Sequence, residues 1–392
     1  MADIFVVAAQ RTAIGTFGGT LRDVAPSALG AAVTRAAVAA AKIDPAAIDH
    51  AVFGQVLPTE PRDAYLARVA AVEGGLPHEV PAVTVNRLCG SGLQAIVSAA
   101  QMLMLGDADI AVAGGAESMS RAPFLSHSTR WGARFGDATL VDALQGALTD
   151  PFHRVAMGVT AENVARKYGI DRATQDAYAL ESQRRAKQAW DEDRFAGQIV
   201  PIEIKRKRET IAFARDEHFR GDSKIEDLAR LPAIFQKDGS VTAGNASGMN
   251  DGAAALVLAT DAAVKRHALT PLARLVAYGH AGVDPAYMGI GPVPATRNAM
   301  ARAGLKVADM DIVESNEAFA AQACAVARDL DFDPAKTNPN GSGISLGHPV
   351  GATGAILATK LIHELRRTGG RYGLATMCIG GGQGIAAIFE RA

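Results

Sequence analysis

The chain of 392 residues lacks the features of several specialised protein classes. Its three cysteines, Cys89, Cys324 and Cys378, are too few for a disulfide framework, and no Cys-x-x-Cys or His-Glu-x-x-His pattern suggests a metal site. Lys and Arg number 40 against 41 Asp and Glu, so no overall electric field favours nucleic acid or an anionic membrane. We therefore expect no metal, no nucleic-acid partner and a reducing, cytoplasmic setting.

Other common signals are also missing. No apolar run reaches the roughly 18 residues that a membrane span needs, so no membrane association is expected. The segment Met1–Val7 reads as a strand start and not as a signal peptide. Aromatic residues make up only 5% of the chain, which favours close helix–strand packing over an aromatic binding surface. No glycine-rich phosphate motif is well placed, so a nucleotide-bearing ligand must be held by other means.

The apolar runs that are present alternate between strand and helix patterns. At this length two or three domains are expected. An almost entirely apolar segment at 93–105 predicts a buried helix. This alternation predicts an α/β core whose first elements are strands at 4–8, 51–54, 83–85 and 110–115 and helices at 28–41 and 93–105.

The pattern changes between about residues 120 and 242. Charged residues become frequent there, including the basic cluster Lys205–Arg208, which is typical of a solvated surface. The α/β pattern then resumes and ends in a hairpin of 374–377 with 385–389. We predict two similar α/β halves with an insertion, bounded as residues 1–120 with 243–270, 121–242 and 271–392.

Four reactive side chains stand in glycine-framed segments. Cys89 lies in Val85-Asn86-Arg87-Leu88-Cys89-Gly90-Ser91-Gly92, and Asn316 lies in Glu314-Ser315-Asn316-Glu317-Ala318-Phe319. His348 lies in Gly347-His348-Pro349-Val350-Gly351-Ala352-Thr353-Gly354, and Cys378 precedes Ile379-Gly380-Gly381-Gly382-Gln383-Gly384. A thiol nucleophile, an imidazole base and an orienting amide are the parts of a cysteine acyl-transfer site.

Cys89 is the predicted nucleophile because it stands where a strand ends and a helix begins. The free N–H groups of a helix start should lower the pKa of its thiol. Gly90 and Gly92 should leave room for a thioester beside the sulfur. The alternative, a small core cysteine, becomes improbable once the other motifs are counted.

The remaining motifs have simpler alternatives. His348 could be a turn residue in solvent, although Pro349 fixes extended backbone there and points the ring off a loop. Asn316 could be a helix N-cap, a role compatible with a catalytic one. The glycines 380–382 could form a plain turn or offer bare N–H groups as an oxyanion hole. Cys324 is expected to be structural.

All four motifs, in this order, resemble the thiolase family, which makes or cleaves 3-ketoacyl-coenzyme A. The resemblance implies that Cys89 is the acylated nucleophile, His348 its base and Cys378 the second acid/base. It also implies two oxyanion holes. One combines His348 with a water held by Asn316, and the other uses the backbone N–H groups of Cys89 and Gly380.

The resemblance extends from Arg11-Thr12-Ala13-Ile14-Gly15 to Gly384-Ile385-Ala386 and implies the thiolase fold: two α/β halves in five layers, αβαβα, with an inserted loop domain. It implies coenzyme A thioesters as substrates, no tightly bound cofactor, and a homotetramer with residues 126–142 at the tetramer contact. Arg220 would hold the nucleotide end of coenzyme A. The pantetheine arm and acyl tunnel would involve Ser247, Ala243, Leu148, Met157, Phe235, Met288, Ala318 and Phe319, although core packing alone could explain the Met and Phe positions.

The motif details favour a biosynthetic or broad-range thiolase, an acetyl-CoA C-acyltransferase of the kind that supplies polyhydroxyalkanoate or lipid precursors. The alternative is a degradative 3-ketoacyl-CoA thiolase, whose members often carry Gly-Leu-Gly after the second cysteine. A non-catalytic relative would be expected to lose one of the reactive residues, and a ketoacyl synthase usually uses two His with one Cys. Ala156 replaces a His common in bacterial biosynthetic members, which predicts a wider acyl path and activity on longer substrates.

Overall fold

The computed structural model describes residues 2–205 and 209–392, so the last three residues of the basic cluster Lys205–Arg208 lie outside the described residues. Two sheets form the core. Strands of the first sheet are β1 (Ile4–Thr12), β3 (His50–Gly54), β4 (Ala82–Val85), β5 (Ile110–Ser118) and β11 (Asn250–Thr260). Strands of the second are β12 (Ala273–Gly282), β13 (Ile312–Ser315), β14 (Tyr372–Ile379) and β15 (Gln383–Arg391).

The two sheets have the same topology. The first runs in the order β1-β11-β5-β3-β4 and the second in the order β12-β15-β14-β13. In each sheet, the strand that comes first in the chain pairs with the strand that comes last, and the next-to-last strand of the chain lies beside that one. The second sheet therefore repeats the strand order of the first, except that it has no counterpart of β4. A short ladder between β1 and β12, with Val6 opposite Ala273, links the sheets. This repeat is the structural form of the similarity expected between the two halves.

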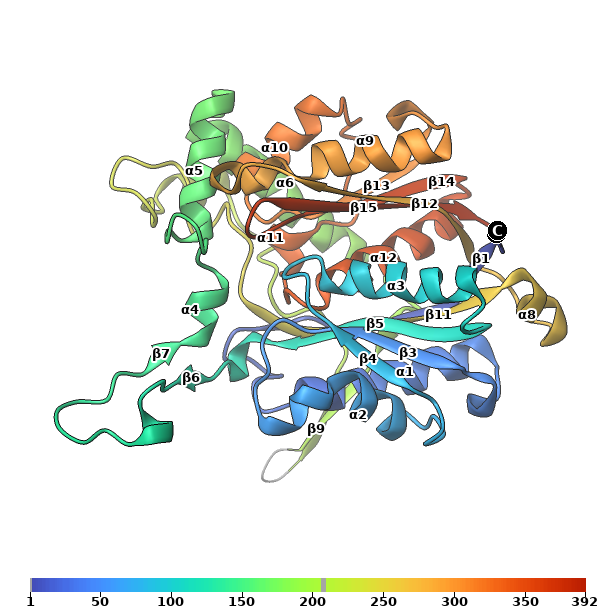
Figure 1. The fold of residues 1–392 in the computed structure, drawn as a ribbon. Coiled ribbons are helices and arrows are strands. Elements are labelled where there is room, and N and C mark those ends of the chain that lie inside the picture. The colour runs from blue at the N-terminus through green and yellow to red at the C-terminus, as the bar shows by residue number, and fades with distance from the viewer. Residues whose placement is uncertain (1, 206–208) are drawn as a thin grey trace.

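Helices fill the space between the sheets and cover their outer faces. The helices are α1 (Pro26–Ala41), α2 (Leu66–Glu73), α3 (Ser91–Leu105), α8 (Asp261–Arg266), α9 (Pro292–Ala303), α10 (Ala320–Asp329), α11 (Gly343–Leu346) and α12 (Thr353–Thr368). Helices α3 and α12 lie between the sheets, α1 and α2 cover the first sheet, and α9 and α10 lie beyond the second (Figure 1). The predicted five-layer thiolase fold is confirmed.

Helix α3 corrects one expectation from the sequence. The 18 residues Leu88–Leu105 have a mean hydropathy of 1.5 and are long and apolar enough to cross a membrane, so the expectation that no such run exists was wrong. More than half of this stretch is buried, and α3 packs against α12 on one side and β5 on the other. A helix in the middle layer of five meets apolar neighbours all round, which accounts for its composition.

The chain makes a long excursion between β5 and β11, residues 119–249. In the second half the equivalent connection, β14 to β15, is only a tight turn at Gly380–Gly382. The excursion contains β6 (Phe124–Leu125), β7 (Val141–Asp142), α4 (Ala143–Ala147), α5 (Met157–Tyr168), α6 (Arg172–Asp191), β8 (Ile199–Val200), β9 (Ile202–Lys205), β10 (Thr210–Phe213) and α7 (Ile225–Ala229). The expected insertion is therefore attached at the end of β5, the strand that corresponds to the strand carrying Cys378.

The sequence patterns located the core helices and strands more accurately than the residues at which these elements begin and end. The helix expected at 28–41 is α1, which begins at Pro26, where a proline is tolerated because the first-turn N–H needs no helical partner. Helices α2 and α5 were not predicted. Helix α2 has only 8 residues, too few for a periodic pattern to stand out, whereas α5 has 12 and lies in the charged stretch where no regular alternation was expected.

Candidate active site

The amino ends of α3 and α12 bring Cys89 and His348 into one site. Both helices begin beside the cavity and cross closely there because each has a glycine at the contact. A Cβ on Gly92 would lie 2.8 Å from the backbone nitrogen of Ala355, and a Cβ on Gly354 would lie 2.2 Å from that of Leu93. Gly92 thus serves helix packing and not the approach of a thioester, which corrects the expectation from the sequence.

Gly90 likewise packs against another part of the chain and not against the cavity. A Cβ at this position would lie 2.5 Å from the side chain of Ile379, in the strand that carries Cys378. Close approach of the Cys89 loop to β14 needs this glycine, so its role is to bring the two thiols together. The room for a thioester comes from other walls of the cavity.

Cys89 sits on a strained turn between β4 and α3. Leu88, the preceding residue, has φ 46°, a left-handed conformation that costs a branched residue about 1–2 kcal/mol. The N–H groups of Gly380 and of Cys89 itself point at the sulfur and lower the pKa of the thiol, but burial outweighs them and raises it, with Glu117 adding to the rise. The predicted lowering of the Cys89 pKa is therefore not found, because desolvation exceeds the effect of the helix start.

His348 is held in one tautomer by its neighbours. Its Nδ1 lies 2.7 Å from Thr353 Oγ1, and that hydroxyl donates its proton to the Pro349 carbonyl at 2.9 Å. Nδ1 must then be the donor, which leaves the lone pair on Nε2. The His348 backbone N–H donates to Asn250 Oδ1 at 2.9 Å. Burial lowers the pKa of His348 to about 4, so the ring is neutral at pH 7 and able to accept a proton.

Asn316 lies against Nε2 of His348, the ring nitrogen that is left as the acceptor. Its Nδ2 is 3.4 Å from His348 Nε2, and its Oδ1 is buried with no hydrogen-bond partner among the described residues. Helix α10 has Phe319 as its N-cap, so the alternative of Asn316 as a helix cap is wrong. An unpaired amide oxygen beside the imidazole fits a group that holds a polar ligand atom.

Cys378, the next-to-last residue of β14, lies at the wall of the same cavity. It is buried, and burial together with the nearby Cys89 raises the pKa of its thiol far above the ordinary value. Gly381 and Gly382 turn the chain back into β15 with φ of 81° and 82°, a conformation that favours glycine. The turn leaves the Gly380 N–H directed at Cys89.

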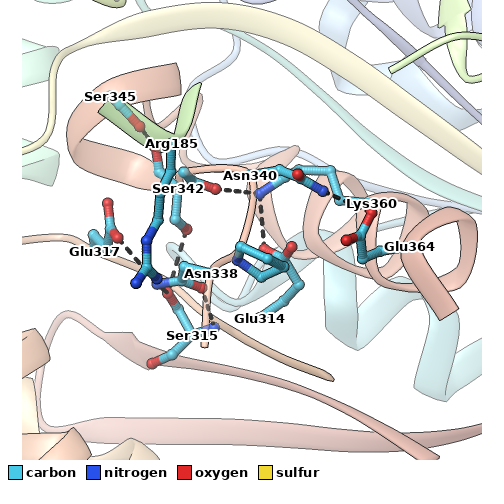
Figure 2. A network of polar contacts seen from close by, with 12 residues as sticks. Arg185, Glu314, Ser315, Glu317, Asn338, Asn340, Ser342, Ser345, Lys360 and Glu364 are labelled. Carbon is cyan, nitrogen blue, oxygen red and sulfur yellow. Dashed lines mark hydrogen bonds and ion pairs between the residues drawn. The ribbon is translucent and has the colours of Figure 1, made fainter. Parts of the chain in front are cut away.

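A buried polar network supports the segment that leads into His348 (Figure 2). Glu317 accepts hydrogen bonds from Ser182 at 2.6 Å and from Asn338 at 3.0 Å, and also from the backbone of α11 at Ile344. Lys360 on α12 donates to Glu314 at 2.8 Å, with both side chains buried. The network therefore fixes β13, α11 and α12 relative to one another, and with them Asn316 and His348.

Two connected pockets lead to these groups. The inner cavity, about 60 Å³, is lined by Cys89, His348, Cys378, Gly380, Leu148, Met157, Met288, Ala318, Phe319 and Ser247, with other apolar side chains. The outer pocket, about 680 Å³, shares Leu148, Met157, Ser247, Phe319 and His348 with it and adds Ala243, Phe235 and Ala156. The inner volume suits a small acyl group and the outer one a longer arm.

Arg220 lies apart from both pockets. It is exposed and lines a third, open pocket in which Lys187, Arg215 and Arg220 lie together with the carboxylates of Asp222 and Asp227. The three cations outnumber the two carboxylates, which fits a phosphate-bearing group. Every expected coenzyme-contacting residue thus lines one of the three pockets, and Asn316 joins the inner one through His348.

Sequence reasoning missed several parts of the site. Val56, Leu57, Leu88, Met119, Leu144, Ala147 and Val350 also line the inner cavity, and apolar residues of this kind give no signal in one sequence. Glu117 is buried and accepts N–H groups from Val56 and Gly351, each at 2.9 Å, while burial raises its pKa to about 8. Thr353 could have been noticed, because it stands five residues after His348 in the same motif.

Comparison with known proteins agrees with this geometry. Residues 4–262 match the family "Thiolase, N-terminal domain" and residues 269–391 match "Thiolase, C-terminal domain". The beta-ketothiolase BktB of Cupriavidus necator is 63% identical over 390 residues, which cover 99% of both chains. The acetyl-CoA acetyltransferase of Pseudomonas aeruginosa is 48% identical, over 100% of both chains.

Solved structures agree as well. The crystal structure of human mitochondrial 3-ketoacyl-CoA thiolase in complex with CoA has a TM-score of 0.97 at 47% sequence identity, covering 100% of this chain and 98% of that chain. The family matches span almost the whole sequence, and the relatives include acetyltransferases and ketothiolases. The chain therefore belongs to the thiolase family of acyltransferases, whose reaction is the reversible Claisen condensation of coenzyme A thioesters.

Proposed function

We propose that the chain carries out the thiolase reaction through an acyl thioester on Cys89. One observation carries this proposal: the thiols of Cys89 and Cys378, the imidazole of His348 and the backbone of Gly380 all line the same small cavity. Two thiols, a neutral imidazole and aimed N–H groups are the parts that a two-step acyl transfer with proton abstraction needs.

In the first half-reaction His348 acts as base toward Cys89. Nε2 accepts the thiol proton, because Nδ1 already donates to Thr353. The thiolate attacks the acyl-CoA carbonyl, whose oxygen gains negative charge near the N–H groups of Cys89 and Gly380. Coenzyme A leaves and takes the proton from His348, so acyl-Cys89 remains.

In the second half-reaction Cys378 acts as base. Its thiolate removes a proton from the α-carbon of a second acyl-CoA, and the resulting carbanion attacks acyl-Cys89. The Cys89 sulfur leaves and receives the proton from Cys378, which restores both groups. His348, with a water held by Asn316, would stabilise the enolate oxygen.

Coenzyme A would lie across the three pockets. Its pyrophosphate and ribose phosphate fit the cationic surface at Arg220, and its pantetheine arm fits the outer pocket beside Ser247 and Ala243. Of these contacts Arg220 lies in the insertion, whereas Ala243 and Ser247 lie just beyond it. We propose the division into residues 1–120 with 243–270, a loop domain at 121–242, and 271–392. All three cysteines are free, and the proposed reaction needs two of them as reduced thiols, which favours a cytoplasmic setting.

We propose a biosynthetic or broad-range role, with degradation of 3-ketoacyl-CoA as the alternative. The likeness to a beta-ketothiolase supports the first role, and the likeness to a human 3-ketoacyl-CoA thiolase supports the second. Ala156 lines the outer pocket, so its small side chain widens the path that longer acyl chains would follow. A supply of precursors for polyhydroxyalkanoate or lipid synthesis would use the reaction in the condensation direction.

The deciding experiment is acylation by acetyl-CoA alone. Peptide mass spectrometry of the digested protein should find one acetyl group, on Cys89, and none on Cys324 as the internal control. An acetyl group on Cys378 in place of Cys89, or on neither, would contradict the proposed nucleophile. Thiolysis rates over 3-ketoacyl-CoAs of increasing length then separate the broad-range role from the alternative.

A further inference from the structure

The segment Arg11–Thr20 forms a socket for two carboxylates of the insertion. Arg11 and Asp216 are fully buried and bind in bidentate fashion, with Nη1–Oδ1 2.8 Å and Nη2–Oδ2 3.0 Å. The Ile14 N–H donates to the same carboxylate at 2.8 Å. A buried ion pair gains little net stability after desolvation, but its geometry fixes the partners closely.

Glu217, the next residue, is held by the other end of the socket. It accepts hydrogen bonds from the Thr20 hydroxyl at 2.7 Å and from the Thr16 backbone at 2.9 Å. Its own N–H donates to the Ile14 carbonyl at 3.0 Å. The segment that follows therefore leaves the socket from a fixed position and in a fixed direction.

That segment joins the outer pocket to the cationic surface. The His218 carbonyl accepts a hydrogen bond from Arg220 Nη1 at 3.0 Å. The His218 ring packs on Gly248, whose Cβ would lie 2.3 Å from it, and Gly248 lines the outer pocket. The position of Arg220 relative to the outer pocket thus depends on residues 216–218, together with Gln183, whose Oε1 accepts the Arg220 backbone N–H at 2.6 Å.

We propose that Glu217 is a positioning residue which, held by Thr16 and Thr20, sets the affinity for the nucleotide half of coenzyme A without touching it. The inference rests on the proposed function, because it takes coenzyme A as the ligand of Arg220. Glu217 lines none of the three pockets, whereas Arg220 lines the cationic one. Loss of the hydrogen bonds to Glu217 should make the loop that carries Arg220 more mobile, while the reaction at Cys89 continues.

The test compares two thiols that differ only in the nucleotide. Thiolysis of an acetoacetyl thioester is measured with coenzyme A and with pantetheine, in native protein, Glu217→Ala and Thr20→Val. Thr20→Ser keeps the hydroxyl donor and serves as the matched control. Glu203→Ala removes an exposed carboxylate of the same insertion. In the first series both the acetoacetyl thioester and the attacking thiol are built on coenzyme A, and in the second series both are built on pantetheine.

We expect the KM for coenzyme A to rise about tenfold in Glu217→Ala and about fivefold in Thr20→Val, since hydrogen bonds to a charged group are of this strength. The kcat, and the kcat/KM with pantetheine, should stay within about twofold of native values. Thr20→Ser and Glu203→Ala should resemble the native protein.

An equal loss with both thiols would overturn the inference, because it would reflect a disturbed outer pocket or fold. Phe17, in the same socket segment, lines the outer pocket and would be the first residue to transmit such a change. Unchanged KM values in both variants would overturn it too. If the native protein cleaves neither substrate series, the proposed function itself fails, and the two failures are thereby distinguished.

Discussion

At the residue scale, Cys89 and Cys378 occupy different environments within one cavity. Cys89 follows a left-handed Leu88 and faces the N–H groups of Gly380 and of its own backbone. Cys378 lies near the end of a buried strand, where burial and the nearby Cys89 outweigh the effect of its own N–H group. Two thiols placed this differently are suited to different steps. The proposed division between nucleophile and second base would then follow from position and not from residue type.

Replacing Cys378 should separate the two half-reactions. Cys378→Ala should still form acetyl-Cys89, but the complete condensation should slow by a factor of about 10² to 10⁴, the usual loss of a general base. Acetylation is measured by mass spectrometry and turnover by coenzyme A release. Cys324→Ala, a partly exposed cysteine outside the inner cavity, is the control. Equal losses in both measurements would refute the division of labour.

His348 should make the fold sensitive to acid. Its pKa is lowered to about 4 in the folded protein, so between about pH 6.5 and 4 the unfolded chain binds a proton there and the folded one does not. Stability should therefore fall as the pH falls. His348→Asn should remove about 3 kcal/mol of this acid-dependent loss in the free energy of unfolding.

Urea unfolding at a series of pH values between 7 and 4 measures this effect. The free energy of unfolding should fall more steeply in the native protein than in His348→Asn. His267→Asn, at an exposed histidine, should follow the native curve. Parallel curves for the native protein and His348→Asn would mean that the ring is not held neutral by burial.

At the scale of elements, the start of α5 shapes the outer pocket. Ala156 is the N-cap of α5 and lines that pocket, as do the next two residues of the helix. Phe235 packs on the bare face of Gly158, whose Cβ would lie 2.1 Å from its ring, so no larger residue fits there without moving this wall. The width of the pocket is therefore set by small residues at one helix end.

Enlarging Ala156 should narrow the substrate range. In Ala156→His the kcat/KM for five- and six-carbon 3-ketoacyl-CoAs should fall relative to the four-carbon one, by about 10- to 200-fold for each methylene excluded. Ala156→Ser, a small change, is the matched control. A native protein confined to four carbons would rule out breadth, and unchanged ratios in Ala156→His would remove Ala156 as its cause.

At the scale of the whole molecule, one part of the insertion extends far from the core. The segment containing β6 and β7 projects to one side (Figure 1). Large apolar side chains are exposed along it, at Phe124, Leu125, Trp131, Phe135, Leu140 and Val141. Apolar groups gathered on a projecting arm are typical of a protein–protein contact, which supports the homotetramer that the resemblance to thiolases implies.

Removing the apolar side chains of the arm should weaken assembly without altering the cavity. Trp131 and Phe135 are 86% and 102% exposed, so neither packs against the described remainder of the chain. Light scattering should find the native protein at four times the mass of the chain and Trp131→Ser/Phe135→Ser at twice it. Tyr65→Ser, another exposed aromatic outside the arm, should leave the mass unchanged. A native protein that is already smaller than a tetramer would contradict this view.

The sequence by itself determined the chemistry and the class of fold. Cys89, His348, Asn316 and Cys378 stand in short motifs that a single chain displays, and period and apolar content placed most core strands and helices. Patterns of this kind reveal only structure that residues close together in the sequence form with one another. They found the long periodic elements, and they missed the helices α2 and α5.

Only the tertiary structure decided how those residues act. It showed that Gly90 and Gly92 admit neighbouring protein and not substrate, that burial raises the Cys89 pKa, and that Thr353 fixes the His348 tautomer. Desolvation and close contact depend on which surfaces meet, and here residues more than two hundred positions apart meet, as Glu117 and Gly351 do. No local pattern encodes such encounters, because each depends on the packing of all five layers at once.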